Sequence, residues 1–506
     1  MSKKRKVWVA VSLAVALVLL IPLGLRWKAQ WQLSAYRKKL IAAGEKLTVE
    51  ELAPRTDPWA TNSALFLRLA SRVQPFWQYQ PTVMLPIKPG VSRVSWRQLQ
   101  LLETEDPSKP ATNIWPGLAA AMKTNEETLN ELRSLVDAGG IEFIQDYSRA
   151  KLNDITYLIK VKQLVSDFMA GAMLALHQGQ RQEALSYITS CGAISQLPAR
   201  DPLMIDQLVR YACVSIAAGG CWEALQAGGW TDEQLAQLQH QWDQSDILAA
   251  AGSSLALERA RAPMAFQAAR ASRQGMEDML GGNSGLKNNA EIWNDFLLRA
   301  STGIKELITS YPRYYGWRWM WSYEDEERHL EFMQNAIEAT RDTQKHHSIL
   351  GFLKDRDEVS DLNSPVANKI DFLRLMTSDT KRFIGLALRA QTVANLVATA
   401  IALERFHLVH HTYPAELSEL APEYFPSVPV DPMDGHDIRY RLNPDGTYLL
   451  YSVGHDGVDD GGDPTPEKDK TKYFLNGRDW VWPRAAREEE VRAYEAEQSK
   501  KSEVKH

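Results

Sequence analysis

Acidic side chains are concentrated in one glycine-rich loop near the carboxyl end of the chain, over residues 454–463. Four carboxylates fall within eight residues there, and the glycines between them let the backbone fold around a point. Unpaired carboxylates held this close repel one another, so a hard cation with oxygen ligands would stabilise the ordered loop. The loop is not an EF-hand, because Val458 stands where a frame beginning at Asp456 needs a ligand. The spacing therefore indicates a candidate calcium site of another type.

The residues before this loop predict a β-hairpin that follows a long helix. Residues 438–442 alternate between apolar and polar side chains, and residues 447–453 are rich in strand-forming types. The Asn-Pro-Asp-Gly sequence at 443–446 favours a turn between them. Upstream, the apolar spacing predicts a helix over 378–411. A small sheet beside a helix is therefore expected to position the loop.

Several motifs around the hairpin occur in an order that is found in a known family. They are Ala400-Ile-Ala-Leu-Glu404, Tyr413-Pro414, Leu417-x-x-Leu420, Pro429-Val-Asp431-Pro432-x-x-Gly435, Tyr440 and Tyr451-Ser-x-Gly454-x-Asp456-Gly457. Over residues 383–465 this order resembles the carboxyl-terminal head of the major pseudopilin of type II secretion systems. The resemblance implies a helix packed on a small antiparallel sheet, with a calcium ion ordering the loop after the last strand. The ligands that it implies are Ser452, Asp456, Asp459, Asp460 and Asp463.

The amino terminus departs from that family and predicts a permanent membrane anchor. Residues 7–25 carry no charged side chain and follow four basic residues at 3–6. As a helix this run spans about 28 Å, close to the thickness of the hydrocarbon core of a bilayer. It has neither the acidic residue of a pseudopilin span nor the small-residue cleavage site of a signal peptide. We therefore expect an uncleaved single-pass helix that is not processed or polymerised like a pilin.

The charges around this run favour a cytoplasmic amino terminus. Basic residues nearly balance across it, with 3–6 on one side and 26, 28 and 37–39 on the other. A tetrabasic tail is nevertheless costly to move across a bilayer, whereas a long carboxyl-terminal domain is translocated largely regardless of charge. We expect a bacterial inner-membrane protein whose bulk is periplasmic, with Trp27 and Trp31 at the interface.

Between the anchor and the hairpin the sequence predicts antiparallel helices joined by short connections. Capping boxes begin at Thr48 and Thr231, glycines at 139–140 end one helix, and prolines within 73–114 predict an irregular wrap. The expected helices are 27–44, 116–138, 154–177, 180–197, 203–227, 231–244, 246–280, 290–309 and 319–343. The predicted fold class is mainly α, with an amino-terminal transmembrane helix, an α-helical hairpin domain and a small α+β head that carries the antiparallel hairpin.

These elements divide the chain into five expected parts. They are a tail and anchor (1–26), a membrane-proximal helix with the wrap (27–115), an α-helical domain (116–377), the pseudopilin-like head (378–480) and a charged tail (481–506). The chain before the head resembles membrane-anchored proteins of planctomycete-type bacteria. The shared motifs are Gly44-Glu-x-Leu-Thr48, Asn62-Ser-Ala64 and Asp201-Pro-Leu-x-Ile205-x-Gln-Leu-Val-Arg210. That resemblance supplies an architecture and no mechanism.

Two further groups could do chemistry, and each has a plainer interpretation. Glu404, His407 and His411 share a helical face, with His410 adjacent, and could hold zinc or another transition metal, although histidines are also common at helix ends. The aromatic stripe 311–323 could stack on a glycan, lie on the bilayer interface or dock a partner. It could equally be a packed joint between two layers of helices, which we favour.

The remaining polar features favour structural roles. Buried thiols are favoured for Cys191, Cys213 and Cys221 over a disulfide from Cys191 to one of the other two. The acidic run 324–327 favours a solvated first turn of a helix. A net charge of −5 gives no electrostatic support for nucleic-acid binding.

Two functions remain open from the sequence. The first is a non-enzymatic envelope scaffold that contacts membrane lipid through residues 7–25, binds a protein partner and carries a calcium-ordered head. The alternative is a periplasmic hydrolase acting on envelope glycan or peptide, with the aromatic stripe as its substrate platform. Neither Gly-x-Ser-x-Gly nor His-Glu-x-x-His occurs in the chain, which favours the first. A deep pocket at Trp317 and Trp319 with two carboxylates would favour the second.

Overall fold

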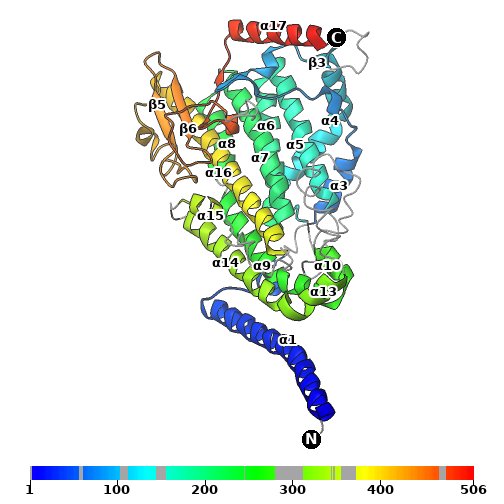
Figure 1. Ribbon diagram of the computed structural model, residues 1–506. Coiled ribbons are helices and arrows are strands. Elements are labelled where there is room, and N and C mark those ends of the chain that lie inside the picture. Colours follow the sequence, from blue (N-terminus) through cyan, green and yellow to red (C-terminus); the bar gives the residue numbers. More distant parts are fainter. Residues whose placement is uncertain are drawn as a thin grey trace.

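The computed structural model is mainly helical, with small sheets, as predicted (Figure 1). The structure describes residues 3–55, 61–102, 112–143, 147, 155–243, 246–279, 311–343, 345, 348–354, 372–466 and 474–505. The helix expected over 290–309 lies outside the described residues. Most side chains of the run 7–25 also lie outside them, so the prediction that this run spans a bilayer stays a prediction.

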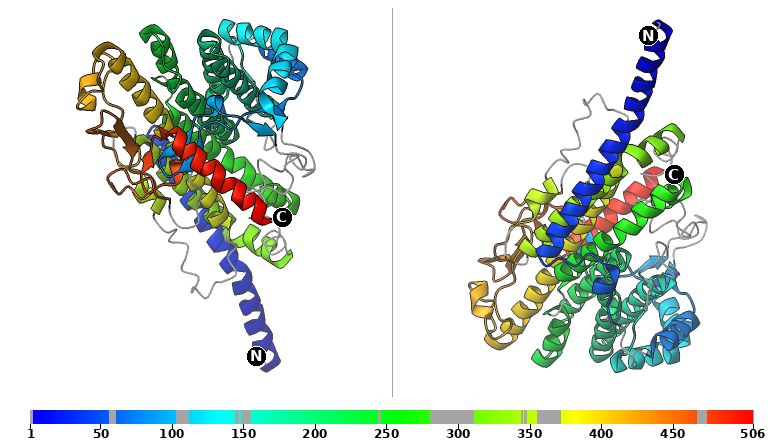
Figure 2. Two further views of the ribbon diagram at one scale, coloured as in Figure 1. Left: turned by 90° about the horizontal axis from the view of Figure 1, so that it is seen from above. Right: turned by 90° about the horizontal axis from the view of Figure 1, so that it is seen from below.

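Helix α1 (Lys3–Ala42) projects from one end of the body as a single long helix that bends along its length (Figure 1). The charge-free run 7–25 and the amphipathic helix expected over 27–44 are therefore one continuous helix. Ala29, Leu33 and Leu40 are buried on one face of α1, which packs against the π-helix η4 (Trp317–Trp321) and helix α14 (Ser322–Thr343). Seen from below, α1 crosses the end of the body (Figure 2).

The body is a layered set of helices whose bounds follow the sequence patterns closely. The helices are α2 (Val49–Leu52), α3 (Ser63–Arg72), α4 (Ile114–Ala138), α5 (Thr156–His177), α6 (Arg181–Ser195), α7 (Met204–Leu225), α8 (Asp232–Asp243), α9 (Ile247–Ala271), α10 (Arg273–Met279), α13 (Tyr311–Gly316), α15 (Leu350–Lys354), α16 (Phe372–His410) and α17 (Glu488–Lys505). Short 3₁₀ helices are η1 (Trp77–Tyr79), η2 (Ser95–Arg97), η3 (Leu197–Arg200), η6 (Leu417–Leu420) and η7 (Phe474–Asn476). Both predicted capping boxes form, at Thr48 with Glu51 and at Thr231 with Gln234. Local capping therefore sets several helix starts.

Three predicted helices differ from the structure. The helix expected over 378–411 begins earlier, at Phe372. The helix expected over 246–280 is broken at Ser272, whose extended backbone (φ −151°, ψ 156°) separates α9 from α10. The helix expected from 319 instead begins at Tyr311 and passes through η4 into α14. A π-turn contains one more residue than an α-turn and therefore shifts the side-chain pattern. A 3.6-residue period read along the sequence does not show that the helix is continuous here.

Helix α16 is the central support of the molecule. In the described residues, Asp379–His410 is the one stretch long and apolar enough to cross a membrane, but 78% of its most apolar window is buried inside the protein. It packs against α7, α8, α9 and α14 and reaches strand β6. A helix buried on all sides is apolar all round, so this stretch is best explained as a core helix.

The strands form three small sheets in the described residues. Strand β1 (Leu85–Lys88) pairs antiparallel with β2 (Val91–Arg93), and β2 pairs parallel with β8 (Arg484–Ala485). Strands β3 (Leu101–Leu102) and β4 (Thr112–Asn113) form a second pair. In the head, β5 (Arg439–Leu442), β6 (Tyr448–Ser452) and β7 (Trp480–Val481) are antiparallel. The expected hairpin is confirmed, whereas the wrap over 73–114 contains strands that its prolines concealed.

The head and the helical body share one hydrophobic core. A continuous cluster of buried side chains runs from Phe66 through α16 to Trp482. The indole Nε1 of Trp222 on α7 donates to the backbone oxygen of Pro483 at 2.7 Å. Strand β7 crosses the expected boundary at 480/481, so the charged part of the tail begins later, at α17. The head is therefore packed into the body along α16.

Candidate functional site

The acidic loop leaves β6 at Ser452 and folds back beside β7. Its glycines have the positive φ angles that other residues rarely adopt, and they are Gly454, Gly457, Gly461 and Gly462. A Cβ atom at Gly454 would lie 2.6 Å from the backbone oxygen of Arg478. The glycine spacing noted in the sequence therefore has the expected role of letting the backbone turn close to the sheet.

The carboxylate that organises the loop comes from outside it. Asp479, fully buried, accepts hydrogen bonds from the backbone amides of Asp460 (3.4 Å), Gly462 (2.7 Å) and Asp463 (3.1 Å). Three converging amide donors form an anion-binding concavity, here filled by a side chain of the same chain. The acidic spacing of the loop did not point to Asp479, because Asp479 lies 16 to 19 residues beyond the amides that it binds. Its place directly before the apolar Trp-Val-Trp run is the one signal that could have found it.

A second buried carboxylate, Asp431, holds the start of the loop. It accepts hydrogen bonds from the backbone amides of Met433 (3.1 Å) and Val453 (3.0 Å) and from the hydroxyl of Ser452 (3.0 Å). Burial raises the pKa of Asp431 above its usual value, although these hydrogen bonds lower it. Ser452, one of the expected calcium ligands, therefore has Asp431 as its partner.

Two arginines supply positive charge to the same region. Arg439 on β5 forms an ion pair with Asp434. Nitrogens of the same guanidinium lie 3.7 Å from a carboxylate oxygen of Asp431 and 3.8 Å from one of Asp459. Arg478 lies 4.0 Å from Asp460 and 3.8 Å from Asp463. These guanidinium groups reduce the repulsion that motivated a bound cation.

The other expected ligands have separate partners in this arrangement. Asp456 accepts a hydrogen bond from Val458 N, and Asp463 accepts one from Thr465 N. Asp459 accepts from the hydroxyl of Tyr451 at 3.0 Å. Among the described residues no group of three or more His, Cys, Asp or Glu side chains is placed to hold a metal ion. The five side chains do not converge as they stand, and calcium binding stays a prediction.

The Glu404 and histidine group at the end of α16 is engaged by aromatic rings. Glu404 accepts a hydrogen bond from the hydroxyl of Tyr413 at 2.8 Å. His407 stacks on the Tyr413 ring with centroids 4.6 Å apart, and His410 packs on Phe406. His411 has a positive φ of 57° at the helix end. These contacts fit the plainer interpretation of a polar helix end.

The aromatic stripe is a packed joint on its inner side, as favoured from the sequence. Tyr314 and Trp317 are buried in a separate cluster with Phe266, and the indole of Trp317 donates to Asp325 at 2.8 Å. The acidic run 324–327 was expected to be solvated, but Asp325 and Glu326 are buried. Glu326 forms ion pairs with Arg37 of α1 and with Arg270 of α9 (2.7 Å). The run is therefore half buried because two arginines from other helices lie against it.

A second ionic group fixes the end of α1. Glu45 forms ion pairs with Arg341 on α14 and with buried Arg259 on α9, the latter at 3.1 Å. The side-chain amide of Gln334 also donates to Glu45 at 3.1 Å. The hydrogen bond from Arg341 is the main reason that the pKa of Glu45 is lowered to about 2.

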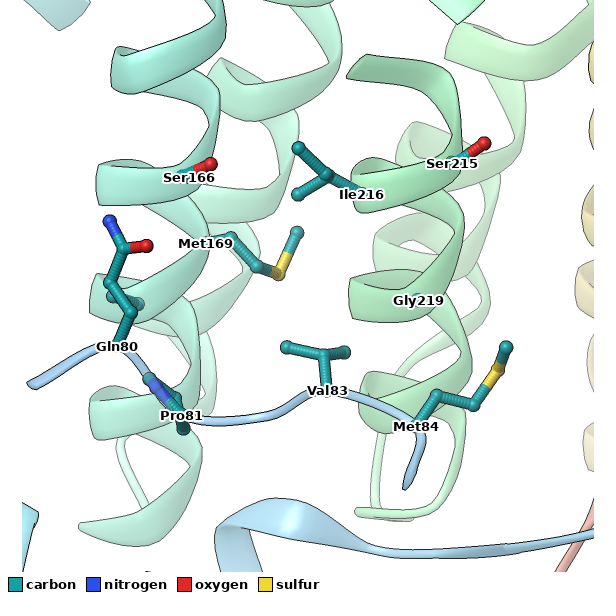
Figure 3. A pocket seen from close by; sticks show the side chains of 10 residues that line it. Gln80, Pro81, Val83, Met84, Ser166, Met169, Ser215, Ile216 and Gly219 are labelled. Carbon is teal, nitrogen blue, oxygen red and sulfur yellow. The ribbon is translucent and has the colours of Figure 1, made fainter. Parts of the chain in front are cut away.

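A cavity of about 350 Å³ lies between α5 and α7, and the 80–84 segment closes one side (Figure 3). Met169 and Ile216 point into it from the two helices. Nearby, Asp167 accepts a hydrogen bond from Gln80 (3.0 Å), and Glu223 accepts backbone amides of Met84 (2.8 Å) and Ser95 (2.9 Å). Burial raises the pKa of both carboxyls to about 7. Because each carboxyl already binds the 80–95 segment, both are best explained as supports of the cavity wall that this segment forms.

The cysteines match the favoured interpretation. Cys191, Cys213 and Cys221 are free and buried, and burial raises the pKa of the Cys213 and Cys221 thiols to about 12. A thiol with so high a pKa is almost entirely protonated near neutral pH and reacts slowly.

Comparison of the chain with protein-family models, with curated proteins and with solved structures finds no match.

Proposed function

We propose that this chain is a non-enzymatic scaffold of the bacterial envelope, held in the inner membrane by one helix, with its helical body in the periplasm. The observation that carries the proposal is the continuity of α1, which runs without a break from the charge-free stretch into the body. An uncleaved anchor needs a single helix whose first half is apolar and whose second half packs against the body. A signal peptide, by contrast, is removed and has no reason to be built into the fold.

The attachment of α1 to the body supports this function. Arg37 pairs with buried Glu326, and Glu45, just beyond the helix end, pairs with Arg259 and Arg341. Partners on two other helices therefore hold the anchor rigidly relative to the body. A rigid attachment suits a protein that presents a surface at a set height above the membrane.

We further propose that the head is pilin-like and that calcium orders its loop. A long helix packed on an antiparallel sheet, with an acidic loop after β6, is the arrangement that the resemblance implies. The proposal concerns structure only and assigns no polymerisation. The protein partner in the envelope is then expected to recognise the body or this head.

Extraction of membranes tests the anchor. We expect the full chain to stay in the pellet after an alkaline wash, with an amino terminus that precedes residue 7. A mature amino terminus beyond residue 25, or recovery in the soluble fraction, contradicts the proposal. A pull-down from membranes in gentle detergent tests the scaffold role, and recovery of the chain alone, without a stoichiometric partner, counts against it.

The described part of the aromatic stripe gives little support to the alternative hydrolase. Its substrate platform was the aromatic stripe, yet Trp317 is buried and its indole is bound to Asp325. The cavity between α5 and α7 is formed by other elements of the body. Turnover of envelope glycan or peptide by the purified full chain would reverse this preference.

A further inference from the structure

Exposed aromatic side chains gather where α1 leaves the body. Trp27 and Trp31 of α1 are 71% and 65% exposed, and Trp319 and Tyr315 of the neighbouring segment are 51% and 46% exposed. These four residues are called the aromatic collar here. Helix α13, which contains Tyr315, and the start of α14 lie at the same end of the body as α1 (Figure 1).

Arginine contacts hold the two parts of the collar together. Arg26 donates to the backbone oxygen of Arg318 at 2.7 Å. Its guanidinium lies 5.2 Å from the centre of the Trp319 ring and 4.8 Å from that of Tyr323. Trp319 is therefore fixed at the level of Arg26, one residue beyond the charge-free run.

The π-helix turns one tryptophan inward and another outward. Trp317 is 1% exposed, in the cluster with Phe266, whereas Trp319 is 51% exposed. A monomeric soluble protein gains nothing from a tryptophan held open to water beside further exposed aromatic rings, and such a patch marks an interaction surface.

The position of the collar along α1 identifies what covers it. If Leu25 ends the hydrocarbon span, the helix rise of 1.5 Å per residue places Trp27 about 3 Å and Trp31 no more than about 9 Å beyond it. The headgroup region on each side of a bilayer is roughly 5–7 Å thick. Trp27 and Trp319, which Arg26 joins, therefore fall within the headgroup region, and Trp31 lies just beyond its outer edge.

The chemistry of the collar suits a lipid surface. Tryptophan and tyrosine rings combine an apolar body with a polar edge, and they concentrate at membrane interfaces for this reason. Arg26, Lys28 and Arg318 add positive charge beside the rings, which is complementary to lipid phosphates.

We propose that the aromatic collar lies in the headgroup region of the periplasmic leaflet and rests the helical body directly on the bilayer. The inference rests on the proposed anchor and goes beyond it, because an anchor alone would allow the body to stand away from the lipid. Its occupant is the lipid surface, and a protein partner covering the same residues is an outcome of the test.

The test places a fluorescent probe at single positions of the full chain in vesicles of phosphatidylethanolamine and phosphatidylglycerol. Trp319→Cys and Tyr315→Cys report on the collar, Leu20→Cys on the span, and exposed Trp77→Cys on a remote part of the body. The native cysteines are buried, so the added thiol is labelled selectively. Lipids that carry a quencher near the headgroup or deep in the acyl chain report the depth of each probe.

We expect the Leu20 probe to be quenched by the deep quencher, both collar probes by the shallow one with a blue-shifted emission, and the Trp77 probe by neither. Unquenched collar probes beside a quenched Leu20 probe overturn the collar and leave the anchor intact. An unquenched Leu20 probe overturns the anchor itself. Collar probes that change emission only when membrane extract is added point to a protein partner and also overturn the inference.

Discussion

At the scale of residues, three buried carboxylates of the described chain bind backbone amides. Asp479 and Asp431 hold the two ends of the acidic loop, and Glu223 holds the 84–95 segment against α7. Each of these carboxylates replaces water around several backbone amides at once, which a single backbone carbonyl cannot do. The acids most important to the head are therefore outside the group of aspartates that the sequence made conspicuous.

Replacing Asp479 with asparagine tests this role. The amide group of asparagine places a donor where the loop needs an acceptor, so we expect the free energy of unfolding to fall by about 2–4 kcal/mol. Urea unfolding of the full chain in detergent measures the loss. Asp463→Asn, which alters a more exposed carboxylate of the same loop, is the matched control, and an equal loss in both variants would contradict the role of Asp479.

The raised pKa of Asp167 predicts a pH dependence. Its pKa is about 7 in the folded protein against 3.8 ordinarily, because burial disfavours the charged form. The folded state then binds a proton that the unfolded chain releases, so this contribution to stability is full below pH 4 and is lost as pH rises towards 7. Asp167→Asn removes the titration, and we expect the variant to gain about 2 kcal/mol relative to the natural chain between pH 5 and 8. Gln80→Ala keeps the carboxyl and is expected to keep the pH dependence; parallel curves for the Asn variant and the natural chain would contradict the assignment.

At the scale of elements, α1 is a packed helix of the body as well as the proposed anchor. Its inner face is apolar, but ion pairs from Arg37 and around Glu45 set its position against α14 and α9. Ionic contacts of this kind are directional, whereas an apolar face alone tolerates sliding. The aromatic collar keeps its place only while this attachment holds.

Glu326→Gln is expected to loosen α1. The change leaves Arg37 and Arg270 without their common carboxylate at a buried position, at a cost of about 3 kcal/mol. Hydrogen exchange is expected to rise in residues 26–42 and 322–330 more than elsewhere. Glu324→Gln removes an exposed pair with Arg328 on one helix, and it should leave exchange in α1 unchanged.

The acidic loop gives a direct test of calcium binding. If calcium binds, its addition raises the melting temperature of the chain, and a hundredfold excess over Kd adds about 2.7 kcal/mol to stability. The double change Asp456→Ala and Asp460→Ala is expected to abolish the rise, while Asp445→Ala in the hairpin turn preserves it. No rise in the natural chain would indicate that Arg439 and Arg478 balance the loop without a metal ion.

At the scale of the whole molecule, the two halves of the chain meet on α7. The wrap after α3 supplies β2, and the carboxyl-terminal segment supplies its parallel neighbour β8. On α7, the indole of Trp222 donates a hydrogen bond to the backbone oxygen of Pro483. Because the core runs without interruption from Phe66 to Trp482, the helical body and the head are expected to unfold together.

Truncated chains separate the contribution of the carboxyl-terminal tail to stability from that of the shared core. A chain ending at residue 487 loses α17, which contributes buried Val491 and ion pairs such as Arg484 with Glu490 and Arg93 with Glu495, so we expect a modest drop in melting temperature. A chain ending at residue 479 also loses buried Trp480, Val481 and Trp482, and it is not expected to fold. Thermal melts followed by circular dichroism compare the two, and equal stability would contradict a closed core.

The sequence by itself determined the features that depend on near neighbours. Apolar periodicity located most helices to within two or three residues, capping boxes marked their starts, and the Asn-Pro-Asp-Gly turn located the hairpin. These signals are readable because a helix turn, a cap and a tight turn each involve residues only a few positions apart. The charge-free stretch at 7–25 is local in the same sense and still awaits its test.

Tertiary structure alone decided which polar groups meet. Asp479 with the acidic loop, Arg37 with Glu326, and β2 with β8 join residues separated by tens to hundreds of positions. No local pattern marks such a pair, since any surface-type residue becomes a buried partner once packing brings the right group beside it. The candidate calcium ligands were found in the sequence because they lie close together along the chain. The groups that bind each of them separately were visible only in the folded chain.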